Sequence, residues 1–496
     1  MPDATPLPTY GLYINGSEVP PASGAYFPTD DPYTNLPWAK IARGNADDVD
    51  RAVAAARAAL VASAWRGLTA SERGKLLRRF GDLVAENAVR LGEIERRDNG
   101  KLAAEVTPQM RYVADYIHYY AGLADKVQGD VIPSDKRGVL AYTRLEPKGV
   151  VAIITPWNSP LALTTWKLAP ALAAGCTAVV KPSEFTSASM IEFAKLATQA
   201  GIPPGVVNVV TGFGADVGEA LVTHPDVAHI GFTGGEAAGR KIYELAASSF
   251  KTVTLELGGK SPNIVFDDAD LDNAVKGVVA GIFAAAGQTC IAGSRLLVQR
   301  NIHDAFVQRL VEFMRDAKMG DPSLPDTQIG PIATRAQFEK IVTYLGVAKG
   351  EGAHCALGGE TWQAPSGGLF VRPTIFTGVH NRMRIAQEEV FGPVLAVIAF
   401  DDLEDAVGIA NDIPYGLAAG VWTRNLHRAM AMSERLEAGT VWINNYRSTS
   451  FTSPFGGYKR SGVGRESGTD AIKEYLQTKC VWVSTDLAVA NPFGRR

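Results

Sequence analysis

The stretch VVAIITPWNSP, residues 150–160, decides the fold class of this chain. Its first five residues are all apolar, and a polar loop that contains prolines follows at once. Further short apolar runs recur along the chain with helical stretches between them: TAVVKP (177–182), VNVVTG (207–212), HIGFTG (229–234) and TVTLELG (252–258). Continuous apolar strands that alternate with helices are typical of a parallel sheet covered on both faces. The sequence therefore predicts an α/β fold.

The flanking sequence predicts further elements on both sides of this sheet. Residues 1–44 indicate turns and short strands, and helices are expected over 45–60, 75–84 and 103–122. The segment 136–147 alternates apolar and polar residues, which predicts an exposed β-ribbon. From about residue 258 a second α/β unit begins, with apolar runs at NIVF (263–266), RLLVQ (295–299), TIFTG (374–378), VLAVIAF (394–400), LAAGVWT (417–423) and GTVWINN (439–445).

Composition and charge narrow the possible functions. The 496 residues are 46% hydrophobic and 20% charged, and the net charge of −3 gives no electrostatic basis for binding nucleic acid or an anionic membrane surface. Polar and helix-breaking residues interrupt the most apolar runs, 149–166 and 277–294, so no membrane span is expected. Four cysteines form neither a disulfide framework nor a metal-binding motif. Because no signal peptide is expected either, the sequence predicts a cytoplasmic protein without a metal.

One cysteine stands in an unusual setting. The run FAAAGQTCIAGSR, residues 283–295, places Cys290 among small and uncharged residues that let other groups approach its sulfur closely. A thiolate is a good nucleophile once it is deprotonated and accessible. The alternative is an inert buried cysteine, which is the commoner case.

Polar residues follow the first two strands of the predicted sheet, at the edge where ligands bind to parallel sheets. Asn158, in the loop TPWNSP, could form an oxyanion hole together with the backbone N–H of Cys290, or could simply be a turn asparagine. Lys181 and Glu184, in VVKPSE, are spaced to bind the hydroxyls of a sugar, with a surface ion pair as the alternative.

The next strands end in glycine-rich turns. The segments 209–218 and 231–239 each predict a strand, a turn and a helix whose N-terminus could receive a pyrophosphate, although both could be ordinary tight connections. Glu256 ends the following strand beside two glycines, where it is a candidate general base or a partner of Lys260. Further along the chain, Glu389 and Phe391 are candidates to bind hydroxyls and a ring, and the glycine-rich segment 453–466 could be only a flexible loop.

Taken in chain order, seven motifs resemble the NAD(P)-dependent aldehyde dehydrogenase superfamily: PWN, KPSE, GFTG, LELGGKSPN, GQTC, EEVFGP and PFGGYKRSG. The resemblance covers nearly the whole chain. It implies a Rossmann-like NAD-binding domain, a second α/β catalytic domain and a small β oligomerisation ribbon, in a homodimer or homotetramer. The implied boundaries are 1–125 with 148–257 for the NAD-binding domain, 258–465 for the catalytic domain, and 126–147 with 466–496 for the oligomerisation segments.

The resemblance also implies the role of individual residues. Its catalytic set is Cys290 as nucleophile, Glu256 as the base for the hydrolytic water, Asn158 as oxyanion donor, and Lys181. Its cofactor-binding set is Thr155, Trp157, Lys181, Glu184, Gly214, Phe232, Thr233, Gly234, Glu389 and Phe391. Its substrate tunnel contains Ser159, Leu163, Trp166, Phe283, Ala284, Arg447, Thr449 and Phe455.

These roles predict oxidation of an aldehyde to the acid, with a thioester on Cys290 that water hydrolyses. NAD is expected rather than NADP, because Glu184 would repel a 2′-phosphate. Gly235 stands where relatives often have serine, which predicts looser cofactor binding. A coenzyme A-acylating dehydrogenase and a non-catalytic, crystallin-like structural protein are the alternatives.

The substrate is expected to be a functionalised semialdehyde or an aromatic aldehyde. Small residues at Ser159, Ala284 and Thr449 suggest a wide tunnel, and Arg447 could bind an anionic substrate tail. The alternative is that Arg447 faces solvent at a subunit edge.

Overall fold

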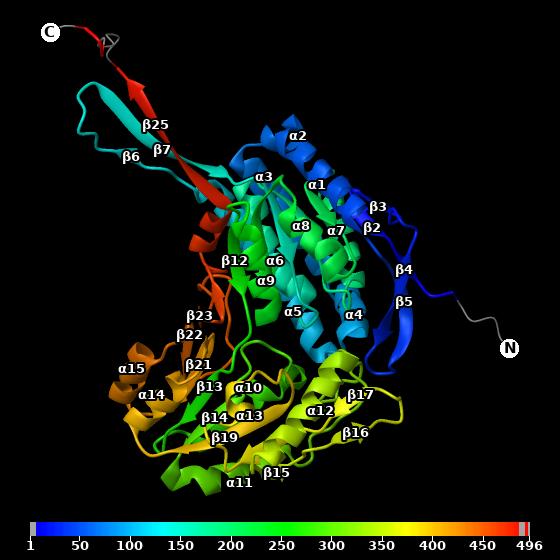
Figure 1. Ribbon diagram of the computed structural model, residues 1–496, viewed down its shortest axis with the longest axis vertical. Coiled ribbons are helices and arrows are strands. Elements are labelled where there is room, and N and C mark those ends of the chain that lie inside the picture. The colour runs from blue at the N-terminus through cyan, green and yellow to red at the C-terminus, as the bar shows by residue number, and fades with distance from the viewer. Residues whose placement is uncertain (1–5, 486–491, 495–496) are drawn as a thin grey trace.

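The computed structural model describes residues 6–485 and 492–494. The molecule is built on two large sheets with helices packed against them, and a ribbon projects from it (Figure 1). Residues 1–5 of the predicted NAD-binding domain lie outside the described residues, as do 486–491 and 495–496 of the predicted oligomerisation segment.

The first sheet has eight strands, and its five central strands are parallel. They coincide with the five apolar runs that decided the fold class, so that prediction is confirmed: β8 (Val150–Ile154), β9 (Thr177–Lys181), β10 (Val207–Val209), β11 (Val227–Thr233) and β12 (Thr252–Glu256). Antiparallel strands close both edges: β2 (Leu12–Ile14) and β3 (Ser17–Val19) beside β10, and β24 (Gly462–Val463) beside β12.

Helices cover both faces of this sheet because alternate strand residues point to opposite sides. Val151 and Ile153 pack in one hydrophobic cluster, whereas Val150, Ala152 and Ile154 pack in another. The first cluster includes α3 (Ala70–Glu86), α4 (Ala88–Asn99), α5 (Ala103–Leu123), α6 (Pro160–Ala174) and α7 (Ala188–Gln199). The second includes α1 (Ala46–Val61), α8 (Glu219–Thr223) and α9 (Glu236–Ala247).

The second sheet has seven strands, six of them parallel. These are β13 (Pro262–Val265), β14 (Arg295–Gln299), β18 (Thr374–Thr377), β19 (Val394–Phe400), β21 (Ala418–Trp422) and β22 (Thr440–Ile443), with β15 (His354–Leu357) antiparallel at one edge. One large hydrophobic core includes these strands and the helices α10 (Leu271–Ile282), α11 (His303–Met314), α12 (Arg335–Gly350), α14 (Leu403–Asn411) and α15 (Leu426–Arg435).

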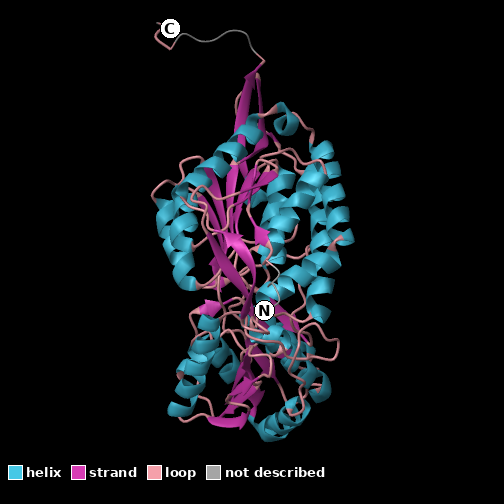
Figure 2. Ribbon diagram, turned by 90° about the vertical axis from the view of Figure 1, so that its right-hand side faces the viewer, coloured by secondary structure: helices cyan, strands magenta, loops and turns pink. Residues whose placement is uncertain are grey.

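The ribbon projects away from both sheets (Figures 1 and 2). It contains β6 (Val131–Ile132), β7 (Val139–Pro147) and β25 (Leu476–Ser484), and β25 pairs with β7 along its whole length. The exposed strand predicted over 136–147 is present from Val139 onward.

Smaller elements complete the fold, and their strands form one three-stranded and two two-stranded sheets. They are β1 (Thr9–Tyr10), β4 (Tyr26–Asp31), β5 (Leu36–Ala42), β16 (Thr361–Gln363), β17 (Leu369–Val371), β20 (Tyr415–Gly416), β23 (Tyr458–Lys459), α2 (Ser63–Arg66) and α13 (Arg384–Gln387). No helix within the described ranges combines the length and the apolar character that crossing a membrane requires.

Candidate active site

The carboxyl ends of the first sheet bring the polar loop residues together. Ile154 pairs with both Lys181 and Phe232, and Thr233 pairs with Glu256. The residues that follow β8, β9, β11 and β12 therefore lie side by side at one edge, where ligands bind to sheets of this kind. The chain then runs from Glu256 directly into β13 of the second sheet, so this edge faces the second sheet.

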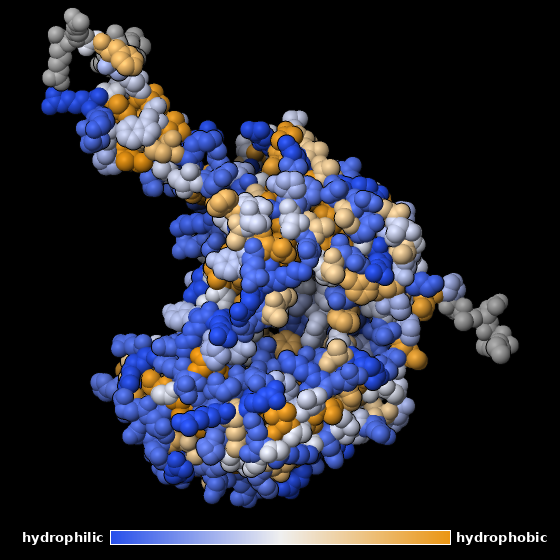
Figure 3. Space-filling model, viewed as in Figure 1, coloured by the Kyte–Doolittle hydropathy of each residue, from blue (hydrophilic) through white to orange (hydrophobic). Residues whose placement is uncertain are grey.

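A cleft of about 170 Å³ lies between the two sheets. Figure 3 shows the surface hollowed between the upper and lower parts of the molecule. Of the residues proposed from the sequence, the cleft brings together Trp157, Asn158, Leu163, Thr233, Gly234, Cys290, Glu389 and Phe391. Gly235, Gln337 and Lys340 line it as well.

Cys290 follows a tight turn and is half-buried at this cleft. The side-chain amide of Asn158 donates a hydrogen bond to the carbonyl of Gln288, two residues before the thiol, at 3.0 Å. An amide nitrogen carries two N–H groups, so one remains for another acceptor beside Cys290. Burial raises the pKa of the Cys290 thiol to about 12, and the negative charges of Glu256 and Glu389 add to this rise. The resting thiol therefore needs a nearby base to form the thiolate.

Glu256 is a buried carboxylate with neither oxygen hydrogen-bonded within the described part of the chain. Burial raises its pKa well above the usual carboxyl value, Glu466 raises it further, and Lys167 opposes the rise. Lys260, the partner considered in the sequence analysis, has a buried Nζ with no hydrogen-bond partner among the described residues. Glu256 is thus held unpaired, which suits a general base.

A buried ion pair near Glu256 was missed by sequence reasoning. Lys167 Nζ lies 2.5 Å from Glu466 Oε1 and donates a hydrogen bond to Thr233 Oγ1. Lys167 is the only charged residue of the apolar helix α6, which was an available signal. Glu466 is the first residue of the predicted oligomerisation segment, yet it is buried here at 2% exposure.

Some candidate cofactor residues lie along the sheet edge but do not line this cleft. Lys181 is buried and donates a hydrogen bond to the carbonyl of Pro182. Its Nζ lies 3.7 Å from Glu184 Oε2, so the pair is not a surface ion pair. Glu184 lines a separate cavity of about 340 Å³. Gly214 begins a π-helical turn whose last residue, Gly218, lies against the side chain of Lys181. Thr155 is buried and its hydroxyl contacts Thr164 at 3.1 Å.

Glycines allow the close contacts at the cleft. A Cβ on Gly234 would lie 2.4 Å from the ring of Phe232, whereas nothing lies within 4 Å of a Cβ on Gly235. A Cβ on Gly258 would lie 2.4 Å from Glu389 Oε2. The other oxygen of Glu389 accepts the N–H of Gly259 at 3.1 Å, and burial raises the pKa of this carboxyl.

The rings of Trp157 and Phe391 meet edge-on at the same cleft, with their centroids 5.3 Å apart.

The candidate tunnel residues have mixed surroundings. Trp166 packs edge-on against Phe455 at 5.1 Å, and Phe283 is buried in the core of the second sheet. Arg447 is half-buried and donates to the carbonyl of Ala280 at 3.0 Å, and Thr449 is exposed.

The hydroxyl of Ser159 accepts from Lys101 and from Gln109, neither of which was singled out from the sequence.

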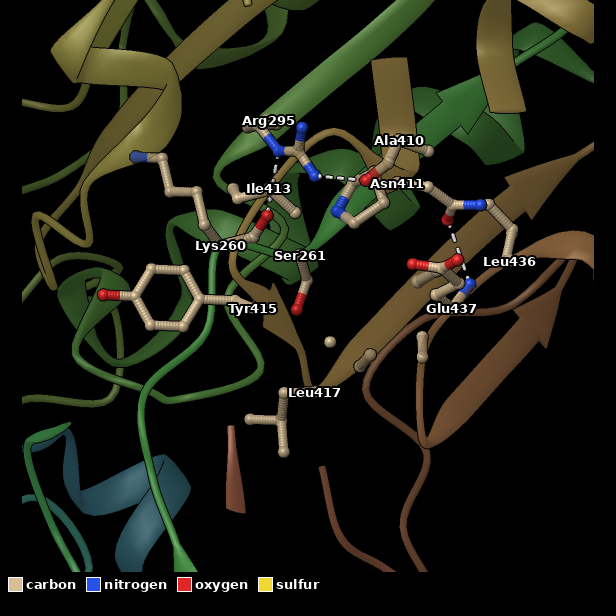
Figure 4. Close-up of a pocket in the computed structure, with 15 residues that line it drawn as sticks. Lys260, Ser261, Arg295, Ala410, Asn411, Ile413, Tyr415, Leu417, Leu436 and Glu437 are labelled. Atoms are coloured by element: carbon tan, nitrogen blue, oxygen red, sulfur yellow. Dashed lines mark hydrogen bonds between the residues drawn. The ribbon is translucent and has the colours of Figure 1, made fainter. Parts of the chain in front are cut away.

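A buried arginine anchors the loop between Glu256 and β13 (Figure 4). Arg295 donates to the carbonyl of Lys260 at 2.9 Å and to that of Ala410 at 2.8 Å, while the side chain of Lys260 points away from it. Because Arg295 also begins β14, directly after the Cys290 turn, it holds the two loops of the site against the second sheet.

Comparison with known proteins assigns this architecture to a family. The sequence pattern described as the aldehyde dehydrogenase family matches residues 19–481. The chain belongs to the aldehyde dehydrogenase family. The predicted family, the predicted α/β fold and the predicted enzyme class are therefore confirmed.

Several family members are similar over their full length. A (Z)-2-((N-methylformamido)methylene)-5-hydroxybutyrolactone dehydrogenase of Acinetobacter baylyi is 48% identical over 490 residues, which cover 98% of this chain and 99% of that protein. A betaine aldehyde dehydrogenase of Mesorhizobium japonicum is 44% identical, covering 98% and 99%. Betaine aldehyde dehydrogenase from Staphylococcus aureus, solved in complex with NAD+, superposes with a TM-score of 0.96 at 40% identity, covering 98% of this chain and 97% of that chain.

Proposed function

We propose that this aldehyde dehydrogenase oxidises an aldehyde to the carboxylic acid with NAD, through a thioester on Cys290. The proposal rests on three groups that lie close together. Cys290 and Asn158 line one cleft. The buried carboxylate of Glu256 has no hydrogen-bond partner in the described part of the chain, and its charge acts on the Cys290 thiol.

The first step forms a bond between Cys290 Sγ and the aldehyde carbon. The thiol proton passes to Glu256, directly or through a water molecule, because burial raises the pKa of Glu256 and so makes it a stronger base than an ordinary carboxylate. The carbonyl oxygen becomes an oxyanion that accepts hydrogen bonds from Asn158 Nδ2 and from the backbone N–H of Cys290. Each such donor contributes about 10²–10³ in rate.

The tetrahedral adduct becomes a thioester when its carbon gives up a hydride, and water then hydrolyses the thioester. Glu256 first releases the thiol proton to solvent. It then accepts a proton from the water as that water attacks the acyl carbon, and Cys290 leaves as thiolate. Burial raises the pKa at which Glu256 works as a base, Glu466 raises it further, and Lys167 opposes the rise.

NAD supplies the hydride acceptor when it is bound. The residues present fit this group. The helix α9 begins at Glu236, and its N-cap residue Gly235 makes no side-chain cap, which leaves first-turn N–H groups for a pyrophosphate. Lys181 and Glu184 would hold one ribose and Glu389 the other, with Trp157, Phe391, Thr233 and Gly234 around the nicotinamide end. The solved relatives that are NAD+ complexes support the same choice.

The direct test is an assay of the purified protein with NAD and a panel of aldehydes. We expect NADH and the carboxylic acid in equal amounts, an unchanged rate when coenzyme A is added, and a higher kcat/KM with NAD than with NADP. An acyl-coenzyme A product would favour the acylating alternative. Cofactor binding with no turnover of any aldehyde would favour the structural protein.

For the substrate, we propose a functionalised semialdehyde or an aromatic aldehyde. The polar side chains of Lys101, Gln109 and Ser159 hydrogen-bond to one another beside the small residues of the candidate tunnel. Arg447 is half-buried and donates a hydrogen bond to the carbonyl of Ala280, so its side chain is not free in solvent. Burial lowers the pKa of Arg447, and the charge of Glu105 opposes this. The relatives named for a substituted butyrolactone and for betaine aldehyde also support a polar substrate.

A matched pair of aldehydes, one neutral and one with a distal carboxylate, tests the role of Arg447. We expect Arg447→Ala to raise KM for the carboxylated aldehyde about tenfold, because a charge-assisted hydrogen bond is lost, and to leave KM for the neutral one unchanged. The control is Arg424→Ala, which removes an exposed arginine paired with Asp270. Equal KM values before and after the change, for both aldehydes, would exclude Arg447 from specificity.

The cytoplasmic location stays a prediction. We also propose that the ribbon mediates the formation of a homodimer or homotetramer. The ribbon exposes Val131, Leu140 and Trp482, the last at 58%, and a partner chain readily extends such an edge strand. Size-exclusion chromatography with light scattering should give a dimer or tetramer, and Trp482→Asp should shift it to smaller species. A concentration-independent monomer of the unmodified protein would contradict the proposal.

A further inference from the structure

The turn that leads into Cys290 is held in an unfavourable conformation. Ala285 and Ala286 both have left-handed backbones, with φ 51° and ψ 31° for the first and φ 51° and ψ 34° for the second. Gly287 follows with φ 71°. Residues with a Cβ disfavour this region, and only glycine adopts it freely. Two consecutive alanines there need a contact that stabilises the turn.

Glu105 supplies such a contact from a distant part of the chain. Its Oε1 accepts the backbone N–H of Ala285 at 2.8 Å, across 180 residues of sequence. Glu105 lies in the first turn of α5, a helix packed into the large core of the first sheet. The strained turn is therefore tied to a rigid element that does not belong to the second sheet.

The surroundings of Glu105 favour its role as the hydrogen-bond acceptor of Ala285. Its other oxygen, Oε2, is buried with no hydrogen-bond partner in the described part of the chain. The charge of Glu105 opposes the lowering of the pKa of both Lys101 and Arg447 by burial, so two cationic side chains lie close to this carboxylate. A charged acceptor makes a stronger hydrogen bond to a backbone N–H than a neutral one.

We propose that Glu105 is a positioning residue, which holds the 285–287 turn left-handed and thereby places the Cys290 thiol against Asn158. This inference rests on the proposed function, in which Cys290 is the nucleophile. The carboxyl end of the turn is already joined to Asn158 through the carbonyl of Gln288, so Glu105 and Asn158 fix the two ends of one short segment.

Removing the acceptor should displace the thiol without affecting the cofactor residues. We expect Glu105→Leu to lower kcat about 10²-fold, the order of loss for a misplacement of about 1 Å. The dissociation constant for NAD should not change, because the proposed cofactor residues lie on other loops. Glu105→Gln keeps an acceptor at the same position and should stay within about fivefold of the unmodified enzyme.

Glycine in the turn should restore part of the loss. In the Glu105→Leu background, Ala286→Gly removes the penalty for a left-handed Cβ residue, and we expect kcat to recover on the order of tenfold. A purely structural role of Glu105 in packing α5 would give no such rescue.

The experiment measures kcat, the NAD dissociation constant and the rate at which iodoacetamide alkylates Cys290, with circular dichroism to establish folding. The control is Glu93→Leu, which removes an exposed carboxylate from the neighbouring helix α4. If Glu105→Leu does not fold, Glu105→Ser replaces it, since serine is too short to reach Ala285.

The proposal is supported if Glu105→Leu, or Glu105→Ser in its place, has a low kcat and an altered alkylation rate while Glu105→Gln keeps a kcat close to that of the unmodified enzyme. The proposal is overturned if Glu105→Leu, or Glu105→Ser in its place, keeps the kcat and alkylation rate of the unmodified enzyme, or if Glu105→Gln loses as much kcat as that variant. An unmodified enzyme that makes no NADH, or whose Cys290 does not react, would instead overturn the proposed function.

Discussion

Cys290→Ala is expected to abolish NADH formation from every aldehyde while leaving NAD binding intact. Cys290 is the only thiol among the described residues that line the cleft, and without it the aldehyde carbon has no covalent partner. We expect kcat to fall by about 10⁴-fold or more, the order found when a nucleophile is removed. The change deletes one sulfur atom from a half-buried side chain, so the folded structure should persist.

Steady-state NADH absorbance measures this loss, and tryptophan fluorescence measures NAD binding. Cys355→Ala is the matched control, because Cys355 is also a half-buried free thiol but lies on the edge strand β15 of the second sheet. Its turnover should equal that of the unmodified enzyme. Turnover above about one per cent in Cys290→Ala would remove the nucleophile assignment.

Glu256→Gln is expected to separate the two halves of the reaction. The glutamine cannot accept a proton from water, so hydrolysis of the thioester should slow by about 10³-fold. Acylation slows less, because the neutral glutamine removes a negative charge that raises the pKa of the Cys290 thiol. A burst of about one NADH per site should therefore precede a very slow steady state. Stopped-flow absorbance distinguishes the two phases.

The pH dependence follows from the same carboxylate. Glu256 acts as a base only when ionised, and its pKa is raised above the usual carboxyl value. The steady-state kcat should therefore rise with pH, over a pH range that lies above the ordinary carboxyl pKa. At lower pH, where Glu256 is protonated, kcat should fall. Glu256→Gln should lack this pH dependence. Glu192→Gln, at a buried glutamate paired with Arg90 and Lys195, serves as control and should keep it. An unchanged steady state in Glu256→Gln would assign the base elsewhere.

Much of this architecture could be predicted from local sequence. The strands β8 to β12 are short, apolar and separated by helices, so their pattern alone indicates a parallel sheet. Polar residues directly after those strands, such as Asn158 and Glu256, were predictable as site candidates because carboxyl strand ends share one edge.

Contacts between distant segments could not be predicted in this way. The pair of Lys167 and Glu466 joins α6 to a loop near the end of the chain. The hydrogen bond from Ala285 to Glu105 joins the second sheet to α5. No local pattern encodes such pairings, because they depend on how the two sheets pack. The left-handed alanines were hidden for a related reason, since alanine ordinarily predicts a helix.

Mass spectrometry can show whether the acyl group is bound to Cys290. Glu256→Gln enzyme is mixed with NAD and an aldehyde, quenched in acid during the steady state, and digested. We expect the peptide containing Cys290 to gain the mass of the acyl group, in an amount equal to the NADH burst. An NADH burst with an unmodified Cys290 peptide, or with the acyl group on another residue, would contradict it.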